Sequence, residues 1–177
     1  MKKLTGKLDS QIEFFKTKFN NNDDFVVRRF ETSGKGACVI FSSGLVNLEL
    51  ISQSVLEPLI LAENIPDEDT IKYLDEEVLF FADSEKSGDV AELIGYVTKG
   101  KAVVMVEGQK EALVLGVDQF QQRAIAEPPT SAVLKGPRRG FVENYKTNLA
   151  LVKEILATPN LKTINLKVGE ISNTDIV

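Results

Sequence analysis

Residues 102–117 read AVVMVEGQKEALVLGV, two apolar runs separated by the turn residues Glu107 to Lys110. Short runs of apolar, β-branched residues on either side of a glycine-containing turn are typical of a β-hairpin. Residues 25–32 and 37–42 repeat the arrangement around the turn Ser33-Gly34-Lys35-Gly36. The two predicted hairpins require at least some antiparallel pairs in the sheet.

Segments with helical spacing of their apolar residues alternate with these strands. Residues 10–20, 46–61 and 90–99 each place apolar side chains three or four positions apart, and Gly100 suits a helix C-terminus. The first of these helices begins at a capping box, Ser10 with Glu13. In the second helix the side chains expected to point inward are Leu48, Ile51, Val55 and Leu59.

Residues 77–82 (EVLFFA) predict a further, buried strand. Helices that alternate with strands indicate an α/β fold in which helices pack on a sheet. Because the hairpins demand antiparallel pairs, we expect a mixed β-sheet. Residues 1–118 are then a first α/β subdomain.

Composition changes at Gln119. Residues 123–140 hold three of the six prolines and show no periodicity, so residues 119–141 are expected to form a surface connector. Proline has no backbone N–H to donate, which argues against a central strand there. Residues 141–157 then predict a helix with Tyr145, Leu149, Val152 and Leu156 on one stripe, and residues 161–168 a half-exposed strand.

Residues 142–177 are therefore expected to begin a second α/β subdomain. Because the chain stops inside an apparent new strand at Val177, we expect it to be truncated there.

Charge and composition exclude several classes of function. The 177 residues carry 21 Lys and Arg against 26 Asp and Glu, a net charge of -5 that disfavours nucleic-acid binding. The chain has no histidine, which excludes Ser-His-Asp and Cys-His sites and His-ligated metals. A single cysteine, Cys38, lies in an apolar run and is expected to be a buried core residue. No apolar run approaches the roughly 18 residues that span a bilayer.

Two further segments are weak matches to known binding motifs. Gly95-Tyr96-Val97-Thr98-Lys99-Gly100-Lys101 resembles a phosphate-binding P-loop, but Ala102 replaces the hydroxyl residue that would bind Mg²⁺. The order of the elements also differs from that of a P-loop, which follows a strand and precedes a helix. Here the glycine-containing segment follows a predicted helix and precedes a strand. The acidic residues 67–69 and 75–77 lack the ligand spacing of a calcium loop and indicate a solvated face. We therefore expect no catalysis, no cofactor and no metal.

The turn Gly136-Pro137-Arg138-Arg139-Gly140 has two possible interpretations. Exposed backbone N–H groups and guanidinium groups suit an anion-binding turn. Neighbouring charges at Arg123, Glu127 and Glu143 suit a docking connector instead. The residues alone do not decide between these two interpretations. They also do not decide whether Asp23-Asp24 and Arg28-Arg29 form a charge pair or are separate surface charges.

These residues also carry a family resemblance. Residues 123–128 (RAIAEP), with Gly136, Pro137, Arg138, Gly140, Phe141, Glu143 and Asn148, resemble the A subunits of GerA-type spore nutrient-germination receptors. Further matches in the same order are residues 24–28 (DFVVR), 44–46 (GLV), 99–101 (KGK) and 106–108 (VEG). The chain departs from the family at Ser131, Lys135 and Arg139, where a glutamate, an arginine and an acidic residue are usual, and at Lys153 and Glu154, where arginines are usual.

The resemblance implies a non-enzymatic role in spore germination. This chain would be the soluble N-terminal domain of an A subunit, on the cytoplasmic side of the spore inner membrane, with membrane-spanning helices beyond residue 177. The A subunit of this family works with B and C subunits. The residues expected to serve assembly or signal transmission are Arg123, Glu127, Pro128, Gly136, Pro137, Arg138, Gly140, Phe141, Glu143 and Asn148.

The alternative is a module that binds a small nutrient directly. Its pocket is expected between the module ending near Val117 and the helix beginning near Phe141.

Overall fold

A computed structural model of the chain describes residues 2–20, 22–118 and 141–177. The elements before the connector are, in order, α1 (Leu8–Lys18), β1 (Phe25–Thr32), β2 (Lys35–Ser42), α2 (Leu48–Leu50), η1 (Ile51–Leu56), α3 (Glu57–Leu61), α4 (Thr70–Tyr73), η2 (Leu74–Val78), β3 (Ser84–Ser87), α5 (Val90–Thr98), β4 (Ala102–Val106) and β5 (Ala112–Leu115). After it come α6 (Tyr145–Ile155), β6 (Leu166–Val168) and β7 (Thr174–Ile176). The segments η1 and η2 are π-helical.

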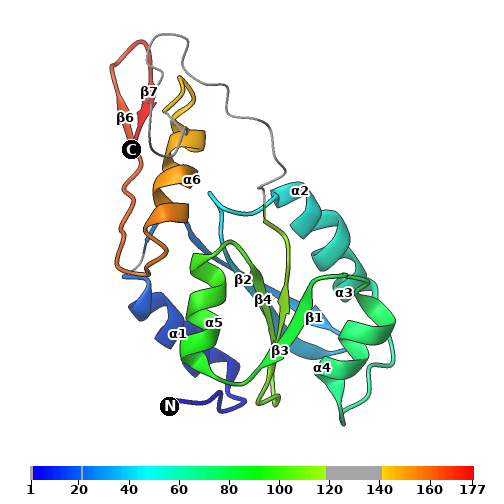
Figure 1. The fold of residues 1–177 in the computed structure, drawn as a ribbon. Helices are drawn as coiled ribbons and strands as arrows, with labels where there is room; N and C mark the ends of the chain where they lie inside the picture. Colours follow the sequence, from blue (N-terminus) through cyan, green and yellow to red (C-terminus); the bar gives the residue numbers. More distant parts are fainter. Residues whose placement is uncertain (1, 21, 119–140) are drawn as a thin grey trace, which may run out of the picture.

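The predicted α/β fold, a sheet with helices packed on it, is confirmed. Five strands lie in the order β1-β2-β4-β5-β3 (Figure 1). Both predicted hairpins are present, with β1 paired to β2 and β4 paired to β5. The expected mixture of parallel and antiparallel pairs is wrong, because every pair in this five-stranded sheet is antiparallel. The hairpins join through β2 and β4, which run in opposite directions, so strand direction alternates across the whole sheet.

Helices cover both faces of the sheet. The helices α1 and α5 lie on one face, and the segments from α2 to η2 lie on the other (Figure 1). Alternate side chains of β2 serve the two layers: Val39 and Phe41 face the α2–η2 side, whereas Cys38 and Ile40 face α1 and α5. Since side chains alternate along a strand, a strand buried on both faces is apolar throughout, as the sequence of β4 is.

The predicted strand at residues 77–82 is wrong. The chain is helical up to Val78, and the strand β3 begins only at Ser84. The Leu79 N–H donates to the Leu74 carbonyl at 2.8 Å, a π-type bond five residues back that places Leu74 and Leu79 on one buried face. Phe80, the next residue, is 84% exposed.

The helix predicted over residues 46–61 begins at Leu48 and ends at Leu61, and one of its four expected core residues points outward. Ile51, Val55 and Leu59 are buried, whereas Leu48 is 52% exposed. The π-helical turns of η1 precede Pro58, which has no N–H for an ordinary helical bond. A π-helical turn contains more residues than an α-helical turn, so side chains are spaced differently around the helix. The prediction that Leu48 points inward assumes the α-helical spacing.

The first helix also begins earlier than its predicted capping box. It begins at Leu8, whose N–H donates to the Glu107 carboxylate at 2.8 Å. Glu107 lies in the β4–β5 turn, so a side chain remote in sequence caps this helix and the Ser10–Glu13 box is not formed. The predicted C-terminus of α5 is confirmed: Gly100 has φ +86° and lies where the helix gives way to strand β4.

The buried thiol of Cys38 predicts an alkaline loss of stability. Burial is the main cause that raises its pKa from 9.0 to about 12. Between these values the unfolded chain releases the thiol proton and the folded chain keeps it, so the free energy of unfolding falls as pH rises. The contribution of this group is at most about 1.4 kcal/mol per pH unit.

Urea unfolding at pH 8 to 11 is expected to show a shallower decline in Cys38→Ala than in the original chain. All other titratable groups are common to the two proteins, so the comparison isolates the thiol. Parallel declines would show that the thiol is not protected from ionisation in the folded state.

Candidate functional site

Most residues of the family motif lie outside the described residues: Arg123, Glu127, Pro128, Gly136, Pro137, Arg138 and Gly140. The expected surface position of the connector therefore also falls outside the described part of the chain. Of the three that the structure describes, Phe141 is 72% exposed and Glu143 is exposed. Asn148 lies on α6.

Asn148 holds the end of the connector against α6. Its amide accepts a hydrogen bond from the Val142 N–H and donates one to the Val142 carbonyl, both at 2.7 Å. Asn144 caps the helix by accepting from the Lys146 N–H at 2.9 Å. These contacts fix the direction in which the chain enters α6, which is a structural reason for an asparagine at position 148.

The main polar cluster of the described structure was not identified from the sequence. It joins the residues after the connector to the β1–β2 sheet edge, and we name it the clamp: Asn22, Asp24, Ser42, Lys153 and Thr163. The Lys153 ammonium pairs with the Asp24 carboxylate, and their side chains are only 7% and 11% exposed. Lys153 also lies 3.5 Å from the Ser42 hydroxyl. A charge this deeply buried needs an opposite charge beside it.

The extended segment after α6 supplies the second half of the clamp. The Thr163 hydroxyl lies within hydrogen-bond distance of the carboxylate of Asp24 and of the side-chain oxygen of Asn22. The Asn22 amide in turn donates to the Leu161 carbonyl at 2.7 Å and accepts from the Thr163 N–H at 3.2 Å. Both α6 and the segment around Thr163 are thus fastened to the loop that precedes β1.

The apolar stripe predicted on α6 does not form the buried face of the helix. Leu151 and Lys153 are its buried residues, whereas Leu156 is 50% exposed. The helix docks through one leucine and one ion-paired lysine, so an apolar pattern could not identify its inner face.

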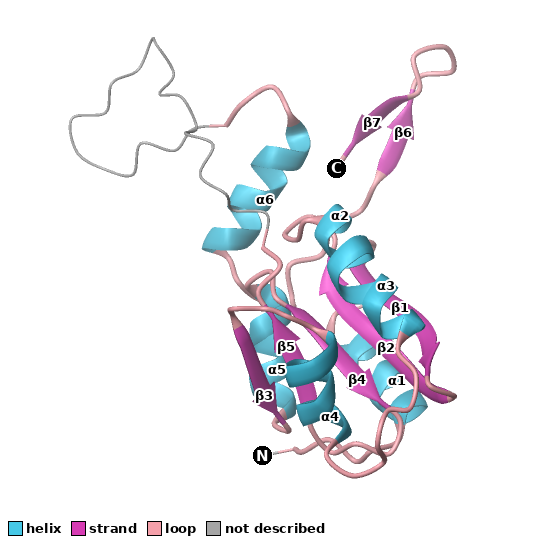
Figure 2. Ribbon diagram, turned by 90° about the vertical axis from the view of Figure 1, so that its right-hand side faces the viewer, coloured by secondary structure: helices cyan, strands magenta, loops and turns pink. Residues whose placement is uncertain are grey.

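After α6, β6 and β7 form a separate two-stranded hairpin (Figure 2). Only Leu166–Val168 of the strand predicted at residues 161–168 is strand.

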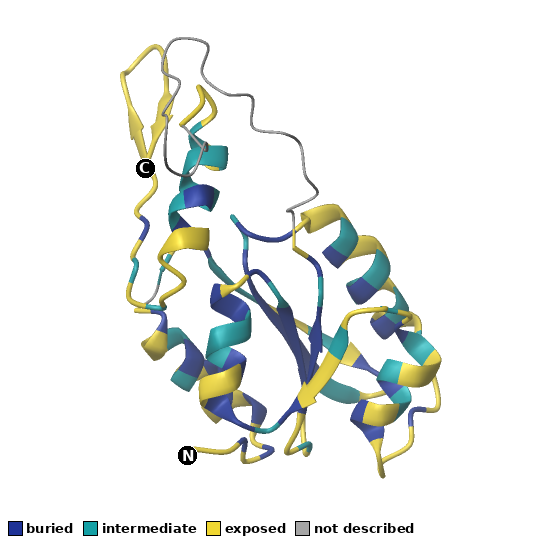
Figure 3. Cartoon of the chain, in the orientation of Figure 1, coloured by how far each residue is buried: buried dark blue, intermediate teal, exposed yellow. Residues whose placement is uncertain are grey.

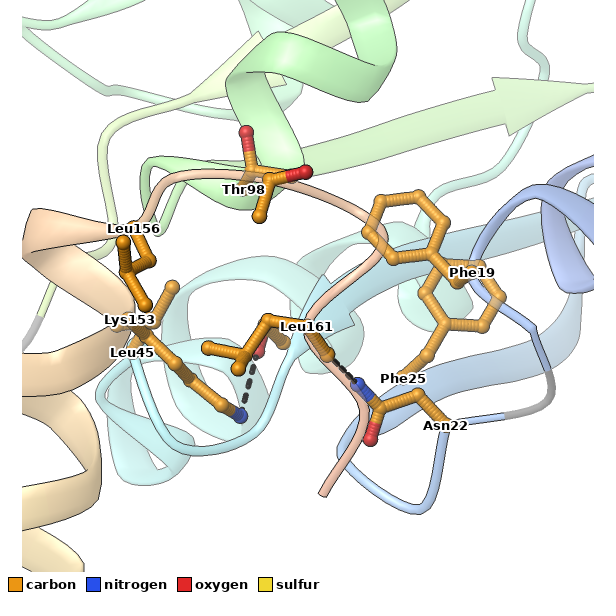
Figure 4. Close-up of a pocket in the computed structure, with 10 residues that line it drawn as sticks. Phe19, Asn22, Phe25, Leu45, Thr98, Lys153, Leu156 and Leu161 are labelled. Atoms are coloured by element: carbon orange, nitrogen blue, oxygen red, sulfur yellow. Dashed lines mark hydrogen bonds between the residues drawn. The ribbon is translucent and has the colours of Figure 1, made fainter.

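A recess lies beside the clamp, between the first module and α6, where the nutrient-binding alternative places its pocket. Phe19, Phe25 and Leu45 form its apolar side, and Lys153 and Leu161 close it (Figure 4). The two phenyl rings are stacked with their centroids 4.4 Å apart. The cavity volume is about 30 Å³, close to the share of one water molecule and roughly a tenth of the smallest usual ligand pocket.

The lysine of the P-loop-like motif is occupied by ion pairs. The Lys101 ammonium lies 3.1 Å from Asp83 and 2.8 Å from Glu85, and the Tyr96 hydroxyl donates to Glu85 at 2.5 Å. Burial opposes the charge of Lys101, but its hydrogen bonds to Glu85 and Asp83 outweigh this and raise its pKa. The hydrogen bond from Lys101 lowers the pKa of Glu85, and the bond to Glu85 raises that of Tyr96. This set holds the end of α5 to β3.

Among residues 2–20, 22–118 and 141–177, no three His, Cys, Asp or Glu side chains are grouped so as to bind a metal ion. In the same residues, no helix has both the length and the apolar character needed to cross a membrane.

Comparison with known proteins places the chain in a family. Residues 13–177 match the model of the Bacillus/Clostridium GerA spore germination proteins. The chain belongs to this family. The resemblance found in the sequence is therefore confirmed.

Individual members of the GerA family resemble the chain over nearly its whole length. Spore germination protein KA of Bacillus subtilis (strain 168) is 30% identical over 178 residues, which cover 98% of this chain and 32% of the relative. Spore germination protein B1 of the same strain is 27% identical, over 94% of this chain and 35% of the relative. The chain thus spans about a third of the length of the curated relatives that it matches.

The fold is shared with a solved member of the germination machinery. The crystal structure of the N-terminal domain of the A subunit of the Bacillus megaterium spore germinant receptor GerK3 superposes with a TM-score of 0.65. Identity is 19%, and the match covers 98% of this chain and 64% of that one. The similarity supports the α/β fold.

Proposed function

We propose that this chain is the N-terminal part of a germinant-receptor A subunit and acts in receptor assembly and signal transmission. It would work with the B and C subunits of the same receptor, on the cytoplasmic side of the spore inner membrane. Segments outside these 177 residues would anchor it in the membrane. This role requires no catalysis and no cofactor from the chain.

The clamp is the observation that carries the proposal. The chain leaves the sheet after β5 and returns as α6, which is fastened through Lys153 and Asp24 to the loop before β1. A force on the residues after the connector therefore reaches the first sheet through a buried ion pair as well as through the covalent chain. We propose residues 1–118 as the first subdomain, 119–141 as the connector, and 142–177 as the start of a second subdomain.

The geometry favours this role over direct binding of a nutrient. In the described part of the chain, the recess beside Lys153 lies at the predicted position of a nutrient site, and its volume is about 30 Å³. Pockets for small molecules are typically about ten times larger.

The connector is the proposed docking element. Arg138 and Glu127 are its main charged contacts, because a charge at a turn fixed by Pro137 or Pro128 loses little entropy on binding. The competing structural role ties Arg138 and Glu127 to each other or to Glu143 within the same chain.

Arg138→Ala separates the two roles, with Arg139→Ala as a matched control in the same turn. If Arg138 docks a partner, the isolated chain keeps its stability within about 0.5 kcal/mol. Spores whose full-length receptor carries Arg138→Ala would respond to nutrient more slowly than the Arg139→Ala spores at equal receptor level. A loss of about 3–5 kcal/mol in the isolated chain would make Arg138 structural. Normal germination at normal receptor level would contradict the docking role.

A further inference from the structure

The outer face of the helices at residues 48–61 carries three large apolar side chains among its polar residues. Leu48, Ile60 and Leu61 are 52%, 54% and 70% exposed. Ser52, Leu56, Glu57, Ile60 and Leu61 line a shallow groove of about 320 Å³ on this face. Exposed residues, interspersed with partly buried ones, lie on the outward side of the layer from α2 to α4 (Figure 3). Grouped apolar side chains in water usually mark a surface that another molecule covers.

The same layer has a strongly negative net charge. Residues 47–83 contain ten Asp or Glu and one Lys, a net charge of -9, whereas the whole chain has -5. Three of the ten are paired with lysines outside the segment, at 2.9 Å (Asp67–Lys35), 3.0 Å (Asp75–Lys86) and 3.1 Å (Asp83–Lys101). In the described part of the chain the other seven have no ion-pair partner: Glu49, Glu57, Glu63, Glu68, Asp69, Glu76 and Glu77.

We propose that this face, with the Leu56–Ile60–Leu61 groove at its centre, docks a positively charged amphipathic helix of a partner protein. Leucine-like side chains of that helix would fill the groove, and its Lys or Arg residues would meet Glu49, Glu57 and the other unpaired carboxylates. Opposite charges around an apolar centre are the arrangement that gives an interface both specificity and a fast association rate.

Charge also argues against the other occupants of such a surface. An anionic membrane repels this acidic face, and two copies of the chain repel each other across it. The proposal is independent of the connector and of the clamp, and so goes beyond the function proposed above.

The test uses the 177-residue chain and a synthetic 18-residue Leu/Lys peptide with leucines at helical i, i+3, i+4 spacing. One control peptide has the same composition with its leucines scattered over all faces, and another carries Glu in place of Lys. The protein variant is Ile60→Ser/Leu61→Ser, which should fold because both side chains are largely exposed. The matched protein control is Ile171→Ser, since Ile171 is 99% exposed on the β6–β7 turn.

Titration calorimetry should show binding of the amphipathic Leu/Lys peptide that weakens with salt. The groove variant should bind it about ten-fold less tightly, a difference of about 1.4 kcal/mol, and Ile171→Ser should bind it normally. Equal binding of the scattered peptide, or equal binding by the groove variant, would overturn the proposal. So would binding of the chain to anionic vesicles, or self-association of the chain, if the groove variant abolished it.

Discussion

Lys153→Ala is expected to weaken the attachment of α6 and of the segment around Thr163 by about 3–5 kcal/mol, the usual cost of removing one partner of a buried ion pair. The cost arises because the Asp24 carboxylate remains buried without its cation. Hydrogen exchange should show early loss of protection in residues 145–165 while the strands of the five-stranded sheet stay protected. Urea unfolding of the same protein measures the loss in total stability.

Lys146→Ala is the matched control, because Lys146 lies on the same helix and is exposed. It should change stability by less than about 0.5 kcal/mol. The double variant Asp24→Asn/Lys153→Met removes both charges and should regain most of the loss, since no charge is then left buried. If Lys153→Ala and Lys146→Ala behaved alike, the clamp would not hold α6 to the sheet.

Phe15→Ala is expected to cost about 3–5 kcal/mol of global stability through the cavity it leaves. The Phe15 side chain is fully buried between α1 and the sheet, in contact with the layer that includes Cys38 and Ile40. Urea unfolding followed by circular dichroism measures this loss directly.

Phe14→Ala controls for the removal of a phenyl ring from the same helix. Phe14 is only partly buried and has the Lys2 ammonium 3.7 Å above its ring. We expect less than half the effect of Phe15→Ala. Equal losses in the two variants would contradict the packing of α1 through Phe15.

Much of the fold could be predicted because local signals agreed with the final packing. Both hairpins, the end of α5 at Gly100 and the surface helix at residues 48–61 follow from turn residues and periodicity. The strand predicted at residues 77–82 failed because a short apolar run is shared by strands and buried helices. At these residues the chain is helical and ends in a π-type hydrogen bond, which cannot be predicted from the pattern of apolar residues.

The clamp could not be predicted for a different reason. Lys153 and Asp24 are 129 positions apart, and each looks like an ordinary surface charge in its local sequence. The sequence places Asp23 and Asp24 near Arg28-Arg29, but Arg29 pairs with Asp9 at 2.5 Å.

In a working receptor, the clamp is expected to couple the residues after the connector to the first sheet. Its most direct test is the nutrient response of spores whose full-length protein carries Lys153→Ala or Asp24→Asn/Lys153→Met. Germination in a mixture of amino acids, sugars and nucleosides is followed by optical density, at receptor levels matched by immunoblot. We expect a response slower by about ten-fold or more in Lys153→Ala, corresponding to a coupling of at least about 1.4 kcal/mol, and substantial recovery in the double variant. A normal rate in Lys153→Ala spores at matched receptor level would contradict it.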